Sequence, residues 1–315
     1  MVLRNGKAGE NVLDRSVYKR IHAVYNRGER ITMSADPVTL PVSGIGEYAV
    51  YAAVNALSAE KILPESFRPV ILLPPGTEER QLREIMDGIG RVCASEGLVI
   101  EGGHTEVTAG VVRPVVIGCC TGTPMTGRSP DDGARSIVMT KWAGMEASCI
   151  LAREREELGR VFPETILYRM RALGRYLSVR EDAVICAEEG AGFLTDLSEG
   201  GFYAALWRLA AKARRGLSVD LLSVPILQET IEFANYYDID PYRMRSAGSL
   251  LAVTRDADAL IGRLKESGIC AARIGELFKD PKDQDKILMN GGEIRYLDLP
   301  QPDEIMKVIG AGDKP

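Results

Sequence analysis

A protein of two domains, each mixing helices with strands, is predicted by three features of the sequence. The chain has 315 residues, which is enough for two domains of ordinary size. Its content of 45% hydrophobic and 26% charged residues is typical of a globular protein. Strand-like apolar runs alternate with helix-like stretches, and residues 123–135 interrupt them with two prolines, two glycines and no periodicity. We therefore predict domains at 1–128 and 129–315.

Charge and hydropathy exclude some classes of partner. The formal net charge of −5 argues against a nucleic-acid surface, which usually carries a basic excess. No apolar run approaches the roughly 20 residues that a membrane helix requires. The N-terminus lacks the apolar core of a signal peptide, so we expect a cytoplasmic protein without nucleic-acid or membrane partners.

The first domain is predicted from periodicity and turn signals. Apolar residues at helical spacing predict a helix over 10–26, and a run of small residues predicts a closely packed helix over 44–59. Between them, Pro37 disfavours helix at Asp36, which should be extended at the end of a strand. A short buried strand at Pro69–Leu73 precedes a helix for which Thr77 is the predicted N-cap.

Asp36 has two interpretations. An extended aspartate at a strand end is a plausible metal ligand. The commoner use of an Asp-Pro pair is to start a turn.

The stretch Glu101–Glu106, Glu-Gly-Gly-His-Thr-Glu, concentrates polar chemistry between two apolar runs. We expect it at the end of a buried strand, where two carboxylates, an imidazole and a hydroxyl need partners. Magnesium suits the carboxylates, and glycine amides can hold a phosphate. The alternative is an ordinary Gly-Gly hairpin with solvated side chains, in which His104 is a hydrogen-bonding structural residue.

The second domain is predicted as strands and helices in alternation. The expected strands are 136–140, 250–253 and 271–274, with a hairpin turn at Asn290-Gly291-Gly292. The expected helices are 141–155, 163–177, 179–189 and 257–267.

A further helix should follow Asp196, with Ser198 as its N-cap. The amides at such a helix start form an anion site, and Asp196 just before it is positioned to hold a cation against a bound phosphate. The alternative is that Asp196 and Ser198 simply cap the helix.

Four segments together resemble the AIR synthase-like superfamily. They are Gly102–Thr108 (GGHTEVT), Thr140–Gly144 (TKWAG), Asp196–Gly201 (DLSEGG) and Asp240–Gly248 (DPYRMRSAG). The resemblance covers roughly residues 6–277. Within the superfamily, the sequence looks most like AIR synthase-related proteins of the hydrogenase maturation factor E-like type. It implies an α/β (α+β) fold of two domains. The N-terminal domain would pair with a second subunit as a dimeric β-barrel, and an α/β C-terminal domain would leave a nucleotide cleft between the two.

The resemblance also implies a function, namely an enzyme that uses ATP and Mg²⁺ to phosphorylate or activate an oxygen of a small-molecule or protein substrate. Acidic residues would hold the metal on the phosphates, and positioning would supply most of the catalysis. By position, the metal ligands would be Asp36 and Asp196, and the catalytic residues His104 and Glu106. The cofactor-binding residues would be Glu101, Gly102, Gly103, Thr105, Lys141, Ser198 and Gly200.

Departures from the family pattern favour a second reading. Residues 27–32 occupy the place where relatives carry a glycine-rich acidic loop, and Ala56 stands where many have an aspartate. No cysteine follows Cys270, so we do not expect the cysteine-tail chemistry of the hydrogenase maturation enzyme in its usual form. The alternative is a catalytically silent homologue, a dimeric scaffold or ligand-binding protein that lost the triphosphate site. A metal-independent hydrolase is a distant third, since no Ser-His-Asp or Cys-His arrangement is evident.

Overall fold

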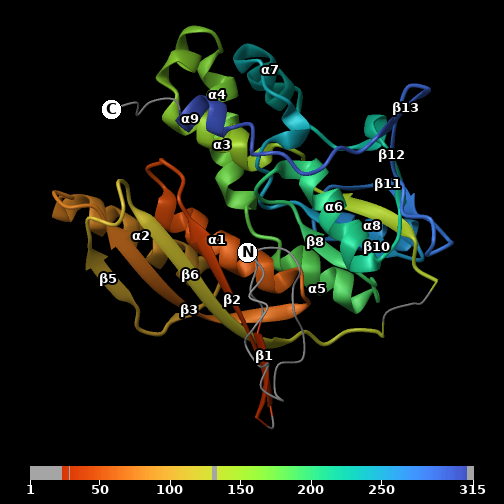
Figure 1. Ribbon diagram of the computed structural model, residues 1–315, viewed down its shortest axis with the longest axis horizontal. Helices are drawn as coiled ribbons and strands as arrows, with labels where there is room; N and C mark the ends of the chain where they lie inside the picture. The colour runs from red at the N-terminus through yellow and green to blue at the C-terminus, as the bar shows by residue number, and fades with distance from the viewer. Residues whose placement is uncertain (1–22, 28, 130–132, 311–315) are drawn as a thin grey trace. The chain divides into compact units, whose positions relative to one another are not determined.

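The computed structural model describes residues 23–27, 29–129 and 133–310 (Figure 1). The chain separates into two compact units, one ending at Met125 and the other beginning at Thr126. Each has its own sheet and its own helices, so each can be described by itself.

The N-terminal unit is built on a six-stranded mixed sheet in the order β1-β2-β6-β3-β4, with β5 also pairing with β3. Neighbours are antiparallel except that β4 and β5 run parallel to β3. The strands are β1 (Ala23–Arg27), β2 (Glu29–Val38), β3 (Ile62–Leu73), β4 (Val99–Ile100), β5 (His104–Val107) and β6 (Val115–Pro124).

Two helices, α1 (Ile45–Ser58) and α2 (Glu79–Ser95), accompany this sheet. Helix α1 contacts β2, β3 and β6 and also packs on α2. Glycine makes both contacts close: a Cβ on Gly118 of β6 would lie 2.6 Å from the Ala49 carbonyl oxygen, and one on Gly46 would lie 2.3 Å from that of Ile85. The small residues of α1 therefore fit between sheet and second helix, as their run in the sequence predicts.

The C-terminal unit is built on a seven-stranded sheet in the order β13-β12-β9-β11-β7-β10-β8. All neighbouring strands are antiparallel except β12 and β9. The strands are β7 (Ser136–Thr140), β8 (Leu194–Asp196), β9 (Leu217–Asp220), β10 (Leu250–Thr254), β11 (Ala271–Leu277), β12 (Lys286–Asn290) and β13 (Glu293–Tyr296).

The helices of this unit are mostly short. They are α3 (Met145–Glu154), α4 (Glu164–Arg171), α5 (Arg180–Glu188), α6 (Gly201–Ala213), α7 (Gln228–Tyr237), α8 (Ala257–Glu266) and α9 (Met306–Ile309). Short 3₁₀ helices also occur in the described part of this unit. η1 (Glu156–Arg160) and η2 (Ala172–Tyr176) lie between helices, and η3 (Leu221–Ser223) and η4 (Pro241–Arg243) flank α7.

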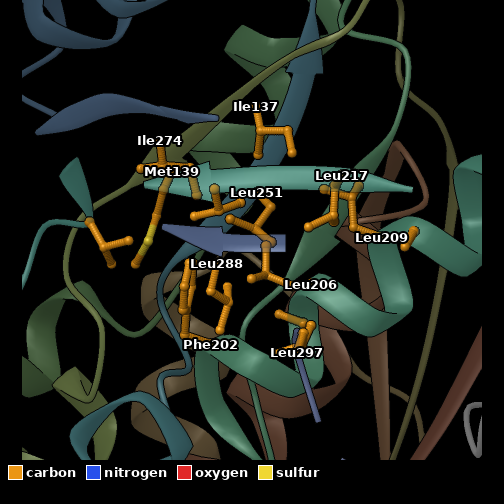
Figure 2. Packing of buried hydrophobic residues seen from close by; sticks show 14 of the residues in the cluster. Ile137, Met139, Phe202, Leu206, Leu209, Leu217, Leu251, Ile274, Leu288 and Leu297 are labelled. Atoms are coloured by element: carbon orange, nitrogen blue, oxygen red, sulfur yellow. The ribbon is translucent and has the colours of Figure 1, made fainter. Parts of the chain in front are cut away.

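The core of the C-terminal unit lies between α6 and the sheet. Figure 2 shows Phe202 and Leu206 of α6 among aliphatic side chains of the strands, including Leu251 and Leu288. Phe202, Leu206 and Leu251 are fully buried, as the apolar periodicity of the helix predicts. This packing fixes where α6 begins, which matters for the site below.

Most of the predicted elements are confirmed. Helix α1, strands β7 and β10, helices α5 and α8 and the β12–β13 hairpin at Gly291 and Gly292 lie where the sequence predicts them. Helix α3 begins four residues later than predicted, and residues 163–177 form α4 followed by η2.

Three predictions about element ends are wrong. The helix over 10–26 is not continued by Ala23–Arg27, which form a strand paired with β2, while 10–22 lie outside the described residues. Helix α2 begins after Glu78, and the Thr77 hydroxyl instead donates to the Pro74 carbonyl oxygen. Helix α6 has Gly200, not Ser198, as its N-cap. The strand pairing of Ala23–Arg27 with β2 decides the first case, and a local hydrogen bond of Thr77 accompanies the second.

Candidate functional site

The stretch Glu101–Glu106 forms a bulged edge strand. Val99 and Ile100 pair with Ser66 and Phe67 of β3, and His104 pairs with Val70. The outer strand thus advances by four residues between these pairs while β3 advances by three. The hairpin alternative is wrong, because the chain continues in the same direction on both sides of the two glycines.

The two glycines are required by this geometry. Gly102 has a φ of +72°, in the left-handed region that glycine adopts without strain. A Cβ on Gly103 would lie 2.8 Å from the carbonyl oxygen of Pro69. The backbone at the bulge is thus close to β3 on one side and open on the other, where a Cβ on Gly102 would meet nothing within 4 Å.

The side chains of this stretch are exposed, and the expectation of a buried strand end is wrong. Every residue from Val99 to Val107 is exposed, because β4 and β5 form the edge of the sheet. The Nε2 atom of His104 lies 3.8 Å from the Glu106 carboxylate, and the two side chains are 64% and 53% exposed. Thr105, on the intervening position of the strand, pairs with Ile71. Arg68 holds Glu101 through a 2.7 Å hydrogen bond from Nε to its carbonyl oxygen.

Asp36 lies in register with the bulge across the sheet, but two strands separate them. It pairs with Gly118, which pairs with Pro69, next to the glycines. Strands β6 and β3 lie between, which corresponds to a separation of roughly 14 Å. Asp36 is 8% exposed and follows the alternation of Ser34, whose hydroxyl donates to the Ala53 carbonyl oxygen of α1. Its carboxylate therefore belongs to the face that α1 covers.

The loop between β8 and α6 in the C-terminal unit brings Asp196, Ser198 and Gly200 together. Arg208 of α6 reaches back to this loop, with Nη2 3.0 Å from the Asp196 carbonyl oxygen and 3.4 Å from the Ser198 hydroxyl. Asp196 is 3% exposed. The sequence pattern does not single out Arg208, because its partners depend on where α6 begins.

The anion position at the start of α6 is filled by the chain itself. Gly200, in the left-handed conformation, donates its amide to Oδ2 of Asp303 at 2.9 Å. The other oxygen of Asp303 accepts from the amides of Arg245 and Ile305, both at 3.2 Å. A carboxylate from the C-terminal segment thus stands where the sequence predicts a phosphate.

Burial raises the pKa of Asp303 to about 6, against the opposing effect of Arg245 and of the amides of Gly200 and Ile305. Arg245 is itself paired with the buried Glu146 at 3.2 Å. No sequence signal indicates Asp303, which is 103 residues away from its partner Gly200.

Lys141 lies in a buried network of the same unit. Its ammonium group donates to Oδ2 of Asp182 at 2.8 Å and to the carbonyl oxygens of Ser178 and Gly248 at 2.7 and 2.8 Å. The second carboxylate oxygen of Asp182 accepts from Thr140 at 2.6 Å. These bonds use all three ammonium protons, and the backbone of Lys141 has a φ of +53°.

Neither a ready-made metal cluster nor a membrane helix is present in the described part of the chain. Within residues 23–27, 29–129 and 133–310, no three or more His, Cys, Asp or Glu side chains are grouped so as to hold a metal ion. None of the helices described is both long enough and apolar enough to cross a bilayer.

This two-domain α/β architecture matches one family of proteins. The model of the N-terminal domain of AIR synthase related proteins matches residues 17–123, and that of the C-terminal domain matches residues 136–287. The chain belongs to the AIR synthase related protein family.

Relatives and solved structures extend the match over most of the chain. Carbamoyl dehydratase HypE of Rhizobium leguminosarum bv. viciae is 24% identical over 299 residues, which cover 89% of this chain and 83% of that protein. The same enzyme of Rhodobacter capsulatus is 25% identical over 300 residues, with 88% and 84% covered.

Two solved structures show the same fold. The crystal structure of the hydrogenase maturation protein HypE in complex with ATP has a TM-score of 0.71 at 19% identity, with 87% of each chain covered. The protein AaThiL complexed with AMPPCP and TMP has a TM-score of 0.67 at 17% identity, with 86% and 87% covered.

Proposed function

We propose that this protein is an ATP- and Mg²⁺-dependent enzyme that phosphorylates or otherwise activates an oxygen of a small-molecule or protein substrate. It would work in the cytoplasm as a homodimer. The observation that carries the proposal is the continuous relationship, through both domains, to enzymes named carbamoyl dehydratase HypE. Because those relatives are enzymes, they favour a catalytic protein over a silent homologue.

Ligands of the structural neighbours support the nucleotide. HypE has been crystallised with ATP. AaThiL has been crystallised with TMP and with AMPPCP, which is a nucleotide. HypE has also been crystallised in complex with HypF. This complex supports a protein, besides a small molecule, as a partner of the chain described here.

The residues of this chain fit the cofactor in part. Carboxylates suit magnesium, and we assign Asp36 and Asp196 to the metal. Asp36 lies under α1 and roughly 14 Å from the bulge, so it fits a metal held away from the two glycines. The open backbone at Gly102 suits a phosphate or the nucleotide itself, beside Gly103, Glu101 and Thr105. Bound Mg²⁺ would offset the charge of the phosphates that it contacts.

Proton transfer falls to the pair His104 and Glu106 in this proposal. Their side chains share one face of β5, because they are two residues apart on a strand, and 3.8 Å separates Nε2 from the carboxylate. Glu106 can orient the imidazole ring by accepting a hydrogen bond from its N–H group. His104 can then take the proton of an attacking hydroxyl group. Both groups are exposed, so an acceptor substrate can approach them.

The start of α6 can hold the cofactor only if the hydrogen bond between Gly200 and Asp303 is broken. Ser198 and Gly200 are assigned to the phosphates, but the Gly200 amide donates to Asp303. A phosphate at this position would have to replace that carboxylate. Lys141 would likewise have to exchange one of its three protein acceptors for the nucleotide.

Calorimetric titration of the full chain with AMPPCP, with and without Mg²⁺, tests the proposal. Asp36→Asn and Asp196→Asn should each weaken Mg²⁺-dependent binding at least about tenfold, since a charge-assisted interaction contributes about 1.5–3 kcal/mol. Asp87→Asn on α2 and Asp258→Asn on α8, both exposed, are matched controls that should bind like the wild type. Thermal melts of all four variants show whether each remains folded.

Two results would overturn the proposal. One is the absence of binding heat at millimolar nucleotide with Mg²⁺ present. The other is binding that neither Asp36→Asn nor Asp196→Asn weakens, which would place the nucleotide elsewhere.

A further inference from the structure

A cavity of about 530 Å³ opens in the N-terminal unit at a place that none of the proposed nucleotide residues lines. Its walls come from the segment Leu40–Ile45 that leads into α1, from the segment 76–81 at the start of α2, and from Arg113 and Pro114 before β6. Small-molecule sites in proteins have volumes of roughly 300–1,000 Å³, so the cavity is of the right size for one.

The cavity results from the close crossing of α1 and α2. Gly46 of α1 lies against the backbone of Ile85, and a Cβ on Gly88 of α2 would lie 3.2 Å from the side chain of Glu47. Arg91 also bonds Glu47 at 2.6 Å, so the two helices are joined on their polar side as well. This crossing brings the starts of both helices to one opening.

Both helix starts lack a side-chain cap. Gly44, which precedes α1, has no side chain that could cap the helix, and the side chain of Glu78, which precedes α2, accepts no hydrogen bond from its helix. The first amides of a helix carry partial positive charge, and here those of two helices border the same cavity.

Arg113 adds a full positive charge to the cavity wall. Its side chain is half-buried, and within the described part of the chain no carboxylate lies within 4.0 Å of it. The other charges on the wall are Arg80 and Glu84, which face each other at 3.6 Å, and Glu78. A half-buried guanidinium without an acceptor is costly unless a ligand supplies one.

The floor of the cavity is apolar. Leu40, Ile45 and Ile85 line it and are 6%, 3% and 2% exposed. Pro41, Val42 and Pro114 extend the apolar lining towards the rim. Of the two charges outside the Arg80–Glu84 pair, Glu78 is exposed and Arg113 is half-buried, so Arg113 is the less solvated of the two. An apolar floor beside such a cation favours a ligand that has an apolar body and one anionic end.

We propose that this cavity binds a small organic anion. Its carboxylate or phosphate contacts the Arg113 guanidinium, and its apolar body lies over Leu40, Ile45 and Ile85. The site is separate from the nucleotide residues proposed above, and it does not depend on whether the protein uses ATP.

Three probes on the full chain test the site, namely phenyl phosphate, 3-phenylpropionate and the neutral 3-phenylpropan-1-ol. Titrations followed by the methyl signals of Ile45 and Ile85 should show both anions saturating the site, and should rank phosphate against carboxylate. The neutral alcohol should bind at least about tenfold more weakly, because it offers Arg113 no charge.

Substitutions locate the anion. Arg113→Gln should weaken both anions about tenfold and leave the alcohol unchanged, and Arg113→Lys should retain part of the affinity. Arg83→Gln, an exposed arginine of α2 that does not line the cavity, is the matched control and should bind as the wild type does.

The proposal is overturned if neither anion shifts the two methyl signals at millimolar concentration. It is also overturned if Arg113→Gln and Arg113→Lys both bind the anions with wild-type affinity. Failure here is distinguishable from failure of the nucleotide proposal, which is read from Asp36 and Asp196 with a different ligand.

Discussion

The stretch Glu101–Glu106 and the β8–α6 loop both place carboxylates beside glycines, yet they are built in opposite ways. The first is an exposed bulge on an edge strand, where the Gly102 backbone faces open space. The second is buried, and the amide of its glycine Gly200 already holds the carboxylate of Asp303. Similar composition therefore gives an exposed, open backbone in one unit and a loop that is satisfied internally in the other.

This difference predicts that substitutions of buried polar residues in the C-terminal unit cost far more stability than substitutions in the exposed stretch Glu101–Glu106. The largest loss is expected for Lys141→Met, which leaves Asp182 buried without its cation. Removal of one partner of a buried ion pair costs about 3–5 kcal/mol. Urea unfolding followed by tryptophan fluorescence measures it, because both tryptophans, Trp142 and Trp207, lie in this unit.

Lys265→Met, an exposed lysine of α8, is the matched control and should change stability by less than about 0.5 kcal/mol. A loss below about 1 kcal/mol for Lys141→Met would show that the network does not hold the unit together.

A pair of glycines gives the next contrast. Gly201 has a φ of +63°, and a Cβ there would lie 2.4 Å from the Met244 carbonyl oxygen. Gly201→Ala should therefore lose about 3 kcal/mol or more, from backbone strain and the clash together. Gly102→Ala should lose only about 1 kcal/mol, since its φ is +72° and no atom lies within 4 Å of the new Cβ. Scanning calorimetry of both variants gives the comparison, and equal losses would contradict it.

Asp303 predicts that the stability of the C-terminal unit depends on pH. Its pKa rises from 3.8 to about 6 on folding, because burial disfavours the carboxylate. The folded state then binds the proton more tightly, so this group's contribution is fully present below about pH 4 and is lost as pH rises through about 6. The loss is at most about 3 kcal/mol.

Urea midpoints of the wild type and of Asp303→Asn between pH 4 and pH 7 measure this contribution. The variant should fall further below the wild type at pH 4 than at pH 7. If its deficit instead grows with pH, the charged carboxylate stabilises the fold through Arg245 and the three amides, and burial is not the dominant effect.

The smallest effect is expected for His104→Ala. The side chains of His104 and Glu106 are 3.8 Å apart and both are more than half exposed, and contacts of this kind contribute little to stability. The free energy of unfolding should change by less than about 0.5 kcal/mol, as measured by calorimetry. A loss above about 1 kcal/mol would show that the edge strand depends on this pair.

Local patterns predict much of the fold. The small residues of α1, the apolar run of β10 and the Asn290-Gly291-Gly292 turn each carry a signal within a few residues, and all three are confirmed. The four segments that resemble the AIR synthase-like superfamily predict the two-domain fold, which the comparisons confirm.

The sites are less predictable because they depend on long-range contacts. The exposure of Glu101–Glu106 follows from its place at the sheet edge, which the alternation of apolar residues does not reveal. Asp303 reaches Gly200 across 103 residues, and Arg113 becomes a cavity wall only when α1 and α2 cross at Gly46. The assignment of catalytic, cofactor and metal residues therefore stays a prediction.

Hydrogen–deuterium exchange of the full chain with and without Mg²⁺ and AMPPCP tests the central claim most directly. If the protein uses ATP through both regions, amides of the peptides spanning Gly102–Thr105 and Ser198–Gly200 should exchange more slowly with nucleotide present. Protection of the first peptide alone would mean that Asp303 keeps its place at Gly200 and would remove Ser198 and Gly200 from the site. Unchanged exchange in both peptides at millimolar nucleotide would contradict the account.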